Sequence, residues 1–170
     1  DAFDITRTFT IKRKFEGKKV LAKKGAGIES IAFVPNPENV EGGTFFVTNQ
    51  STKKHAGRAD RSALIEIEAP LKSSKDKRAG ARIVAYIPMD VQDLAGIGYD
   101  YRRDLLLIVS DSENTLLEVT RGGVVKASYP LPGKNQEGVD VDNDGNLYVA
   151  QDSGGIVKYG RAKGASNRKA

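Results

Sequence analysis

The chain has 170 residues and a net charge of +5, with no cysteine and a single histidine. This length suits one domain that buries about 70% of its unfolded surface. The composition excludes disulfides, thiolate nucleophiles and cysteine-ligated zinc. His55 lies in a basic, polar stretch, which indicates a solvated side chain rather than a catalytic one. No apolar run approaches the ~18 residues that a membrane-spanning helix needs.

Apolar residues alternate or run in short blocks that end at Gly, Asn, Asp or Pro, a pattern typical of strands and turns. Residues 4–11 alternate as a strand does. Three segments then share one pattern of two strands and a loop, at residues 27–49, 93–111 and 135–152. Each is followed by a third short strand, at 64–67, 116–119 and 155–159, and the first two units add a fourth, near 82–87 and 124–129.

Four short antiparallel strands per repeat form a propeller blade. We therefore predict an all-β fold of about three β-propeller blades, each of four antiparallel strands, arranged as a partial or open propeller. The predicted domain covers residues 1–159, with blades at about 28–88, 94–129 and 136–159 and an N-terminal strand at 4–11. Residues 160–170 form a basic, flexible tail.

Three blades are too few for a closed ring, which needs four to eight. The strand at 4–11 is therefore expected either in a preceding blade, as its outer strand, or in the third blade, as its missing fourth strand. The chain itself is either part of a larger propeller or a half-propeller covered by a partner.

Two polar insertions lengthen the first unit, at residues 50–62 and 72–82. The candidate partner-binding residues lie in these insertions and in the tail: Lys53, Lys54, Arg58, Arg61, Lys77, Arg78, Arg161 and Lys163. Their charge favours an anionic partner, for which we expect a protein with an acidic surface. The loops lack the aromatic residues that stack on bases, so specific nucleic-acid binding is not expected. Peripheral membrane association and a merely solvated basic face both stay open.

Acidic residues recur at two positions of the repeat. Glu29 and Glu137 stand where the innermost strand begins, and Asp111 and Asp152, together with Asn49, end the second strand. In a propeller these positions lie near the central channel, where carboxylates can hold a cation or activate water. Glu29, Glu137, Asp111 and Asp152 are therefore candidate metal ligands. The alternative, which we favour, is a structural role in which they accept hydrogen bonds from backbone amides and hold neighbouring blades together.

A second candidate metal site lies between the first two strands of the third unit. Asp140, Asp142 and Asp144 alternate as in a calcium loop, and Gly145 occupies its sixth position. The twelfth position, however, is Gln151 rather than a bidentate Glu. We favour an Asp-Gly turn over a metal loop. Ca²⁺ is the one cofactor that the sequence suggests, and none is certain.

The repeats resemble a known family. The segments Asp-Leu-Ala-Gly-Ile-Gly-Tyr-Asp, Leu-Ile-Val-Ser-Asp-Ser-Glu-Asn and Gln-Glu-Gly-Val-Asp-Val-Asp-Asn-Asp-Gly-Asn-Leu-Tyr-Val-Ala, within residues 93–159, resemble the last two blades of the SdiA-regulated propeller family. Residues 27–33 resemble its preceding blade. This family is similar to the NHL-repeat, esterase-like phytase and gluconolactonase-like propellers. Ala95, where members often have Ser, and the basic insertions depart from the family pattern.

The resemblance implies a six-bladed ring, of which this chain would cover about half. It also implies an exported protein, in the periplasm, an organelle lumen or outside the cell. Our leading hypothesis is a non-enzymatic binding or scaffolding module that docks on a larger assembly through blade edges and basic loops. The alternative is a Ca²⁺-dependent hydrolase of the phosphoester or lactone type, with Glu29, Glu137, Asp111 and Asp152 as ligands.

Overall fold

The structure is a computed structural model, and it describes residues 3–21, 27–51 and 61–160. Within these ranges the secondary structure consists of strands and contains no helix, and hence none long and apolar enough to cross a bilayer. Three sheets follow one another along the chain, and each contains three or four antiparallel strands in sequence order; the first sheet also carries an N-terminal strand that pairs in parallel with its edge. The predicted all-β fold of propeller blades is therefore confirmed.

The three sheets are named blades 1 to 3. Blade 1 contains β4 (Ile28–Pro35), β5 (Gly43–Asn49), β6 (Ala63–Glu68) and β7 (Arg78–Pro88). Blade 2 contains β8 (Leu94–Asp100), β9 (Leu105–Ser110), β10 (Thr115–Val119) and β11 (Val125–Pro130). Blade 3 contains β12 (Gln136–Val141), β13 (Leu147–Gln151) and β14 (Gly155–Tyr159). The remaining strands are β1 (Thr8–Ile11), β2 (Lys14–Phe15) and β3 (Lys18–Lys19).

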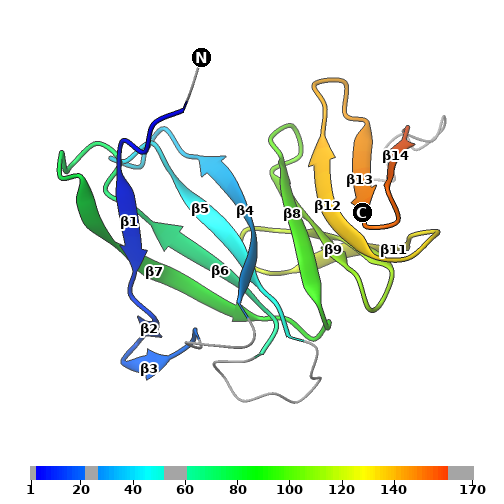
Figure 1. Cartoon of the computed structure of the whole chain (residues 1–170), viewed down its shortest axis with the longest axis horizontal. Coiled ribbons are helices and arrows are strands. Elements are labelled where there is room, and N and C mark those ends of the chain that lie inside the picture. The colour runs from blue at the N-terminus through cyan, green and yellow to red at the C-terminus, as the bar shows by residue number, and fades with distance from the viewer. Residues whose placement is uncertain (1–2, 22–26, 52–60, 161–170) are drawn as a thin grey trace.

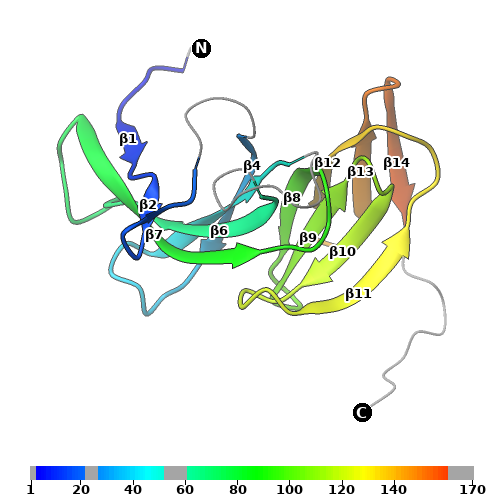
Figure 2. The ribbon, with the colours of Figure 1, turned by 90° about the horizontal axis from the view of Figure 1, so that it is seen from below.

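The innermost strands β4, β8 and β12 lie side by side and contact one another in that order (Figure 1). Seen from below, the sheets succeed one another from β4–β7 through β8–β11 to β12–β14 (Figure 2). Within the described residues, blade 3 has three strands, and β14 pairs only with β13. The described part of the chain is thus a stack of three blades, in which β14 is an edge strand.

Apolar cores fill both spaces between blades. The core between blades 1 and 2 contains Ala32, Val34, Phe46, Leu64, Met89, Leu94, Ile97, Leu106, Ile108, Leu117 and Val119. The core between blades 2 and 3 contains Leu107, Val109, Leu116, Leu131, Val139 and Val149. Alternation along β9 explains both cores, because successive side chains of a strand point to opposite faces of its sheet.

Two glycines of β8 bring the inner strands close together. A Cβ atom on Gly96 would lie 2.9 Å from the carbonyl oxygen of Glu137 and 3.0 Å from the Cα of Gly138. A Cβ atom on Gly98 would lie 2.8 Å from the carbonyl oxygen of Val139. Only glycine therefore permits this approach of β12 to β8.

The N-terminal strand lies in neither of the two places expected from the sequence. β1 pairs in parallel with β7, from Thr8 opposite Arg78 to Ile11 opposite Ala81, and so extends the outer edge of blade 1. Phe9 and Ile11 pack against the core on the outer face of blade 1, and this contact explains why β1 pairs with β7. The buried residues of this third core are Val20, Leu21, Val47, Ala63, Ile65, Ile67, Ala69, Ala81 and Ile83.

Candidate functional site

Each blade has a β-bulge at the same point of its innermost strand. In β4 the pairing register shifts between Ile28 and Ser30, so Glu29 is the extra residue. The same shift makes Ala95 the extra residue of β8 and Glu137 that of β12. A bulge changes the direction of its side chain relative to the rest of the strand. The positions aligned in the sequence as Glu29, Ala95 and Glu137 are therefore structurally equivalent.

The second shared position differs from the expected one by one residue in blade 1. Three backbone hydrogen bonds define it: Gln50 N to Gly27 O (2.9 Å), Asp111 N to Asp93 O (3.1 Å) and Asp152 N to Asn135 O (2.9 Å). Gln50, and not Asn49, is thus the equivalent of Asp111 and Asp152. Asn49 lies one position earlier, where it is fully buried and its Nδ2 donates to the Arg61 carbonyl at 2.8 Å.

Five carboxylates gather where these inner strands begin and the second strands end, and we call them the acidic rim: Glu29, Asp93, Asp111, Glu137 and Asp152. Burial raises the pKa of Glu137, and the negative charges of Asp152, Asp111, Asp93 and Glu29 raise it further. The blades therefore bring together all four of the rim residues expected from the sequence and add Asp93. Such a concentration of negative charge favours cationic groups.

Asp93 was not among the expected site residues. It is 8% exposed, its Oδ1 accepts a hydrogen bond from Gln50 Nε2, and its backbone N donates to the Ser51 carbonyl at 2.8 Å. It therefore links blade 1 to blade 2. Its φ of 56° matches the 59° of Asn135, two residues before the bulge of blade 3. The shared Asp/Asn type at this spacing is the signal that could have identified it.

The acidic rim does not fit a calcium ion in its present arrangement. Within the described residues, no three Asp, Glu or His side chains are grouped so that they could hold a metal. Ca²⁺ requires six to eight oxygen ligands at 2.3–2.6 Å, and Asp93 is already engaged with Gln50. We therefore derive no chemical step through a metal.

The Asp140–Asp144 segment forms a turn closed by its own hydrogen bonds. Asp142 accepts from Asp144 N (2.9 Å), Asn146 N (2.8 Å), Asn146 Nδ2 (2.8 Å) and Tyr148 Oη (2.9 Å). These bonds, the one from Asn146 Nδ2 above all, hold the pKa of Asp142 far below its usual range. Gly145 takes a φ of 80° at the end of the turn. The Asp142 carboxylate thus stabilises a turn, as the favoured interpretation of the sequence expects.

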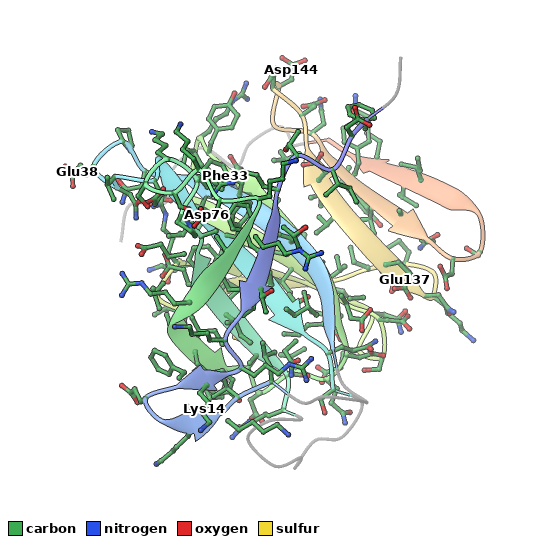
Figure 3. All side chains as sticks on the ribbon, turned by 60° about the vertical axis from the view of Figure 1, so that its left-hand side comes forward. Lys14, Phe33, Glu38, Asp76, Glu137 and Asp144 are labelled. Atoms are coloured by element: carbon green, nitrogen blue, oxygen red, sulfur yellow. The ribbon has the colours of Figure 1, made fainter. Side chains whose placement is uncertain are left out.

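The two groups of candidate ligands do not form one site. Figure 3 shows Asp144 and Glu137 at opposite ends of β12. Asp140 accepts from the adjacent Val141 N at 2.8 Å. Any role of this turn is therefore separate from the acidic rim.

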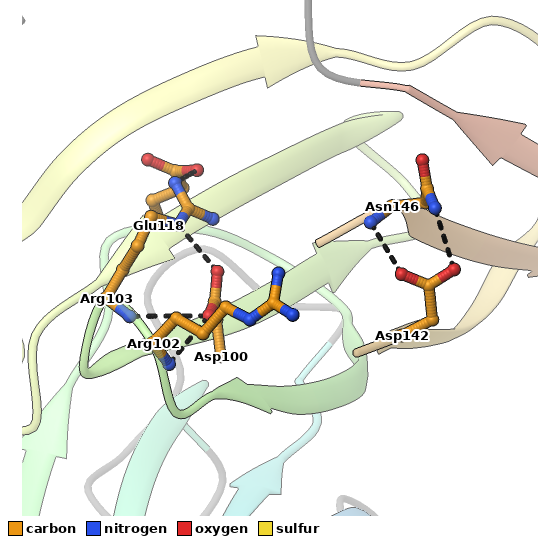
Figure 4. A network of polar contacts seen from close by, with 6 residues as sticks. All are labelled: Asp100, Arg102, Arg103, Glu118, Asp142 and Asn146. Carbon is orange, nitrogen blue, oxygen red and sulfur yellow. Dashed lines mark hydrogen bonds and ion pairs between the residues drawn. The ribbon is translucent and has the colours of Figure 1, made fainter. Parts of the chain in front are cut away.

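A different ion-pair network stabilises blade 2. Arg103 Nε donates to Asp100 Oδ2 at 2.6 Å, and Arg103 Nη1 donates to Glu118 (Figure 4). Burial alone would raise the pKa of Asp100, but the Arg103 hydrogen bond and charge lower it below its usual value. The Asp100 side chain is 2% exposed, so this pairing keeps a buried carboxylate ionised.

The described basic candidates lie on blade 1. Lys77 and Arg78 are exposed at the start of β7, beside β1, where the Lys77 carbonyl accepts from Thr8 N at 2.9 Å. Arg61 is half-buried just before β6. The other candidates, Lys53, Lys54, Arg58, Arg161 and Lys163, lie outside the described residues.

The profile of one protein family, described as SdiA-regulated, matches residues 19–154. The chain belongs to the SdiA-regulated family. The match covers blades 1 and 2 and the strands β12 and β13 of blade 3, so the family membership expected from the blade motifs is confirmed. No curated protein matches this SdiA-regulated chain.

Solved structures share its fold at low sequence identity. Sqt1 of Saccharomyces cerevisiae has a TM-score of 0.53 and is 14% identical, over 85% of this chain and 34% of its own. Kuenenia stuttgartiensis hydrazine synthase has a TM-score of 0.50 and is 16% identical, over 81% of this chain and 32% of its own. The SdiA-regulated chain thus spans about a third of these structures, and the likeness shows the propeller fold alone.

Proposed function

We propose that this chain is a non-enzymatic binding module that docks on a larger partner through its blade edges and basic loops. The observation that supports the proposal is the unpaired outer edge of blade 3 among the described residues. Among the described residues, β14 offers its outer edge unpaired, whereas the corresponding strands β6 and β10 each have a further neighbour. Unpaired edges are where sheets add strands from a partner.

Charge indicates the partner's chemistry. Lys77 and Arg78 are exposed on the outer edge of blade 1, and β1 beside them begins after Arg7. Arg7 itself is anchored, since its guanidinium donates to the carbonyls of Leu71 and Pro70, both at 3.0 Å. We propose a protein partner with an acidic surface, met by Lys77, Arg78 and the basic loop and tail residues.

The experiment measures binding of poly-glutamate to the chain by fluorescence anisotropy over a series of salt concentrations. Binding should weaken as salt rises, because exposed charges are screened. The Lys77→Glu/Arg78→Glu double variant should bind more weakly than wild type. The Lys126→Glu/Lys134→Glu variant, which changes the net charge equally but on blade 2 and in the β11–β12 loop, is the matched control. Equal losses in both variants, or no binding by wild type, would contradict the proposal.

The second candidate function is a Ca²⁺-dependent hydrolase of the phosphoester or lactone type, favoured by the convergence of the acidic rim on Glu137. It requires these carboxylates to rearrange around an ion. Calorimetric titration with CaCl₂, with melting curves before and after chelation, tests it. No heat of binding and an unchanged melting temperature would remove this candidate.

A further inference from the structure

A surface cavity of about 380 Å³ lies on the outer part of blade 1, where β1, β7 and the β4–β5 and β6–β7 loops meet. Pockets for small molecules usually have volumes of about 300–1,000 Å³. The polar groups and the glycine that matter for binding are Lys12, Glu41, Glu68, Ser73, Gly80 and Arg82.

This cavity is separate from the acidic rim. Glu41 follows the end of β4, whereas Glu29 of the rim lies at the start of the same strand. Figure 3 shows Glu38 and Asp76, which belong to the two loops, on the same side of the view and away from Glu137. A ligand of the cavity would therefore not contact the rim carboxylates.

The loops that form the cavity walls are tied together by a buried carboxylate. Glu41 is 5% exposed, and its Oε2 accepts hydrogen bonds from Lys72 N at 2.6 Å and Ser73 N at 3.2 Å. The Arg7 guanidinium also binds the β6–β7 loop, through two of its backbone carbonyls. The walls are thus held in place by the protein's own contacts, as is usual for ligand sites.

Both carboxylates of the cavity already have partners. The hydrogen bond from Lys72 N, above all, lowers the pKa of Glu41, and the Lys72 charge lowers it further. Glu68 Oε1 accepts from Arg82 Nε at 2.9 Å and forms an ion pair with Arg82 Nη2 at 2.7 Å. Lys12 is exposed and, among the described residues, has no carboxylate partner. Three cations therefore lie around two carboxylates, and this surplus favours an anionic ligand.

Gly80 leaves space beside Lys12. A Cβ atom on Gly80 would meet only Lys12 Cε, at 3.8 Å, so a larger side chain would project into the cavity. A glycine inside a strand often marks a place where a ligand approaches the backbone closely. Gly80 therefore gives a ligand access to the Lys12 ammonium.

We propose that this cavity binds a small hydroxylated anion, either a hydroxy acid or a phosphate ester. The anionic group pairs with Lys12, and the hydroxyl groups donate hydrogen bonds to carboxylate oxygens of Glu41 and Glu68. Each carboxylate oxygen accepts more than one hydrogen bond, so these groups can bind hydroxyls while keeping their present partners. The inference goes beyond the proposed function, because it concerns a small molecule in a cavity rather than a protein at a blade edge.

The experiment follows the amide resonances of the isotope-labelled 170-residue chain by NMR during titration with small molecules. Glycerate and glycerol phosphate carry an anionic group and hydroxyls, and they should bind and shift the amides of Ser73 and Gly80. Propionate lacks hydroxyls and glycerol lacks charge, so each should bind about tenfold or more weakly, because hydrogen bonds to charged groups contribute at least this factor. Tighter binding of glycerate identifies a hydroxy acid and tighter binding of glycerol phosphate a phosphate ester, and both results support the inference.

Three variants locate the site. Lys12→Gln should weaken the binding of both hydroxylated anions by about tenfold or more, because it removes their charged partner. Gly80→Leu should abolish binding, because the new side chain occupies the space beside Lys12. Lys18→Gln is the matched control, since Lys18 is exposed in β3 and does not line the cavity, and it should bind as wild type does. Circular dichroism should show all three variants folded.

The results that would overturn the inference are distinct from those expected. No binding of either hydroxylated anion by wild type would remove the site. Equal losses in Lys12→Gln and Lys18→Gln would show attraction to the overall charge rather than to the cavity. Equal affinities for propionate and glycerate would exclude hydrogen bonds from ligand hydroxyls to Glu41 and Glu68.

Discussion

Replacing Gly96 with alanine tests whether the inner strands of blades 2 and 3 are as close as the register of the bulges requires. The new methyl group would lie 2.8 Å from Val109 Cγ2, 2.9 Å from the Glu137 carbonyl oxygen and 3.0 Å from Gly138 Cα. Two of these contacts are with backbone, which cannot rotate away. Overpacking of this kind costs about 1–3 kcal/mol. The smaller entropy of the unfolded alanine chain offsets about 0.4–1 kcal/mol, so we expect a net loss of about 1–2 kcal/mol.

The assay is urea unfolding followed by circular dichroism, with Gly80→Ala as the matched control. Gly80 also lies in a strand, but a methyl group there would meet only Lys12 Cε, at 3.8 Å. This variant should be as stable as wild type or slightly more so, because alanine lowers the entropy of the unfolded chain and the methyl group creates no clash in the folded one. Equal unfolding midpoints for the two variants would refute the close approach of β8 and β12, and with it the equivalence of the three bulges.

Three further predictions concern titrating groups. The pKa of Glu137 is raised in the folded protein, so the free energy of unfolding falls as the pH rises from 4.5, the usual pKa of Glu, through the raised pKa. Glu137→Gln removes this charge. Its melting temperature should therefore exceed that of wild type at neutral pH and equal it in acid. The pKa of Asp142 is lowered in the folded protein, so its carboxylate stabilises the fold above pH 3.8, the usual pKa of Asp, and this stabilisation is lost as the pH falls. Asp142→Ala should therefore lower the urea midpoint at neutral pH, and the difference from wild type should shrink in strong acid. Arg103→Ala leaves the buried Asp100 without its charged partner and should cost about 1–3 kcal/mol by urea unfolding, whereas Arg103→Lys should cost less.

The strands and their repetition could be predicted because they depend on local pattern. The expected strand at 105–110 coincides with β9, since its apolar run is bounded by turn residues on both sides. The rim positions of blades 2 and 3 followed from the same repetition. Blade 1 was misaligned by one residue, with Asn49 in place of Gln50. Two amide residues, Asn49 and Gln50, stand next to each other at the end of this strand, and the sequence pattern does not show which of them accompanies the bulge of β4.

The pairing of β1 could not be predicted either. Its alternation shows that residues 8–11 can form a strand, but the choice of β7 as partner depends on Phe9 and Ile11 meeting the core of blade 1, some 70 residues along the chain. The role of Asp93 could not be predicted for a similar reason, because it depends on a contact between blades, the hydrogen bond from Gln50.

The amino-acid sequence by itself determined that this protein is all-β, that it repeats a four-stranded unit and where its turns lie, because side-chain alternation and turn chemistry act over a few residues. Only the tertiary structure decided which carboxylates meet around Glu137 and which apolar residues, such as Ile31, remain exposed. Those properties arise when separate sheets pack face to face, and the packing partner of each sheet lies far from it in the chain.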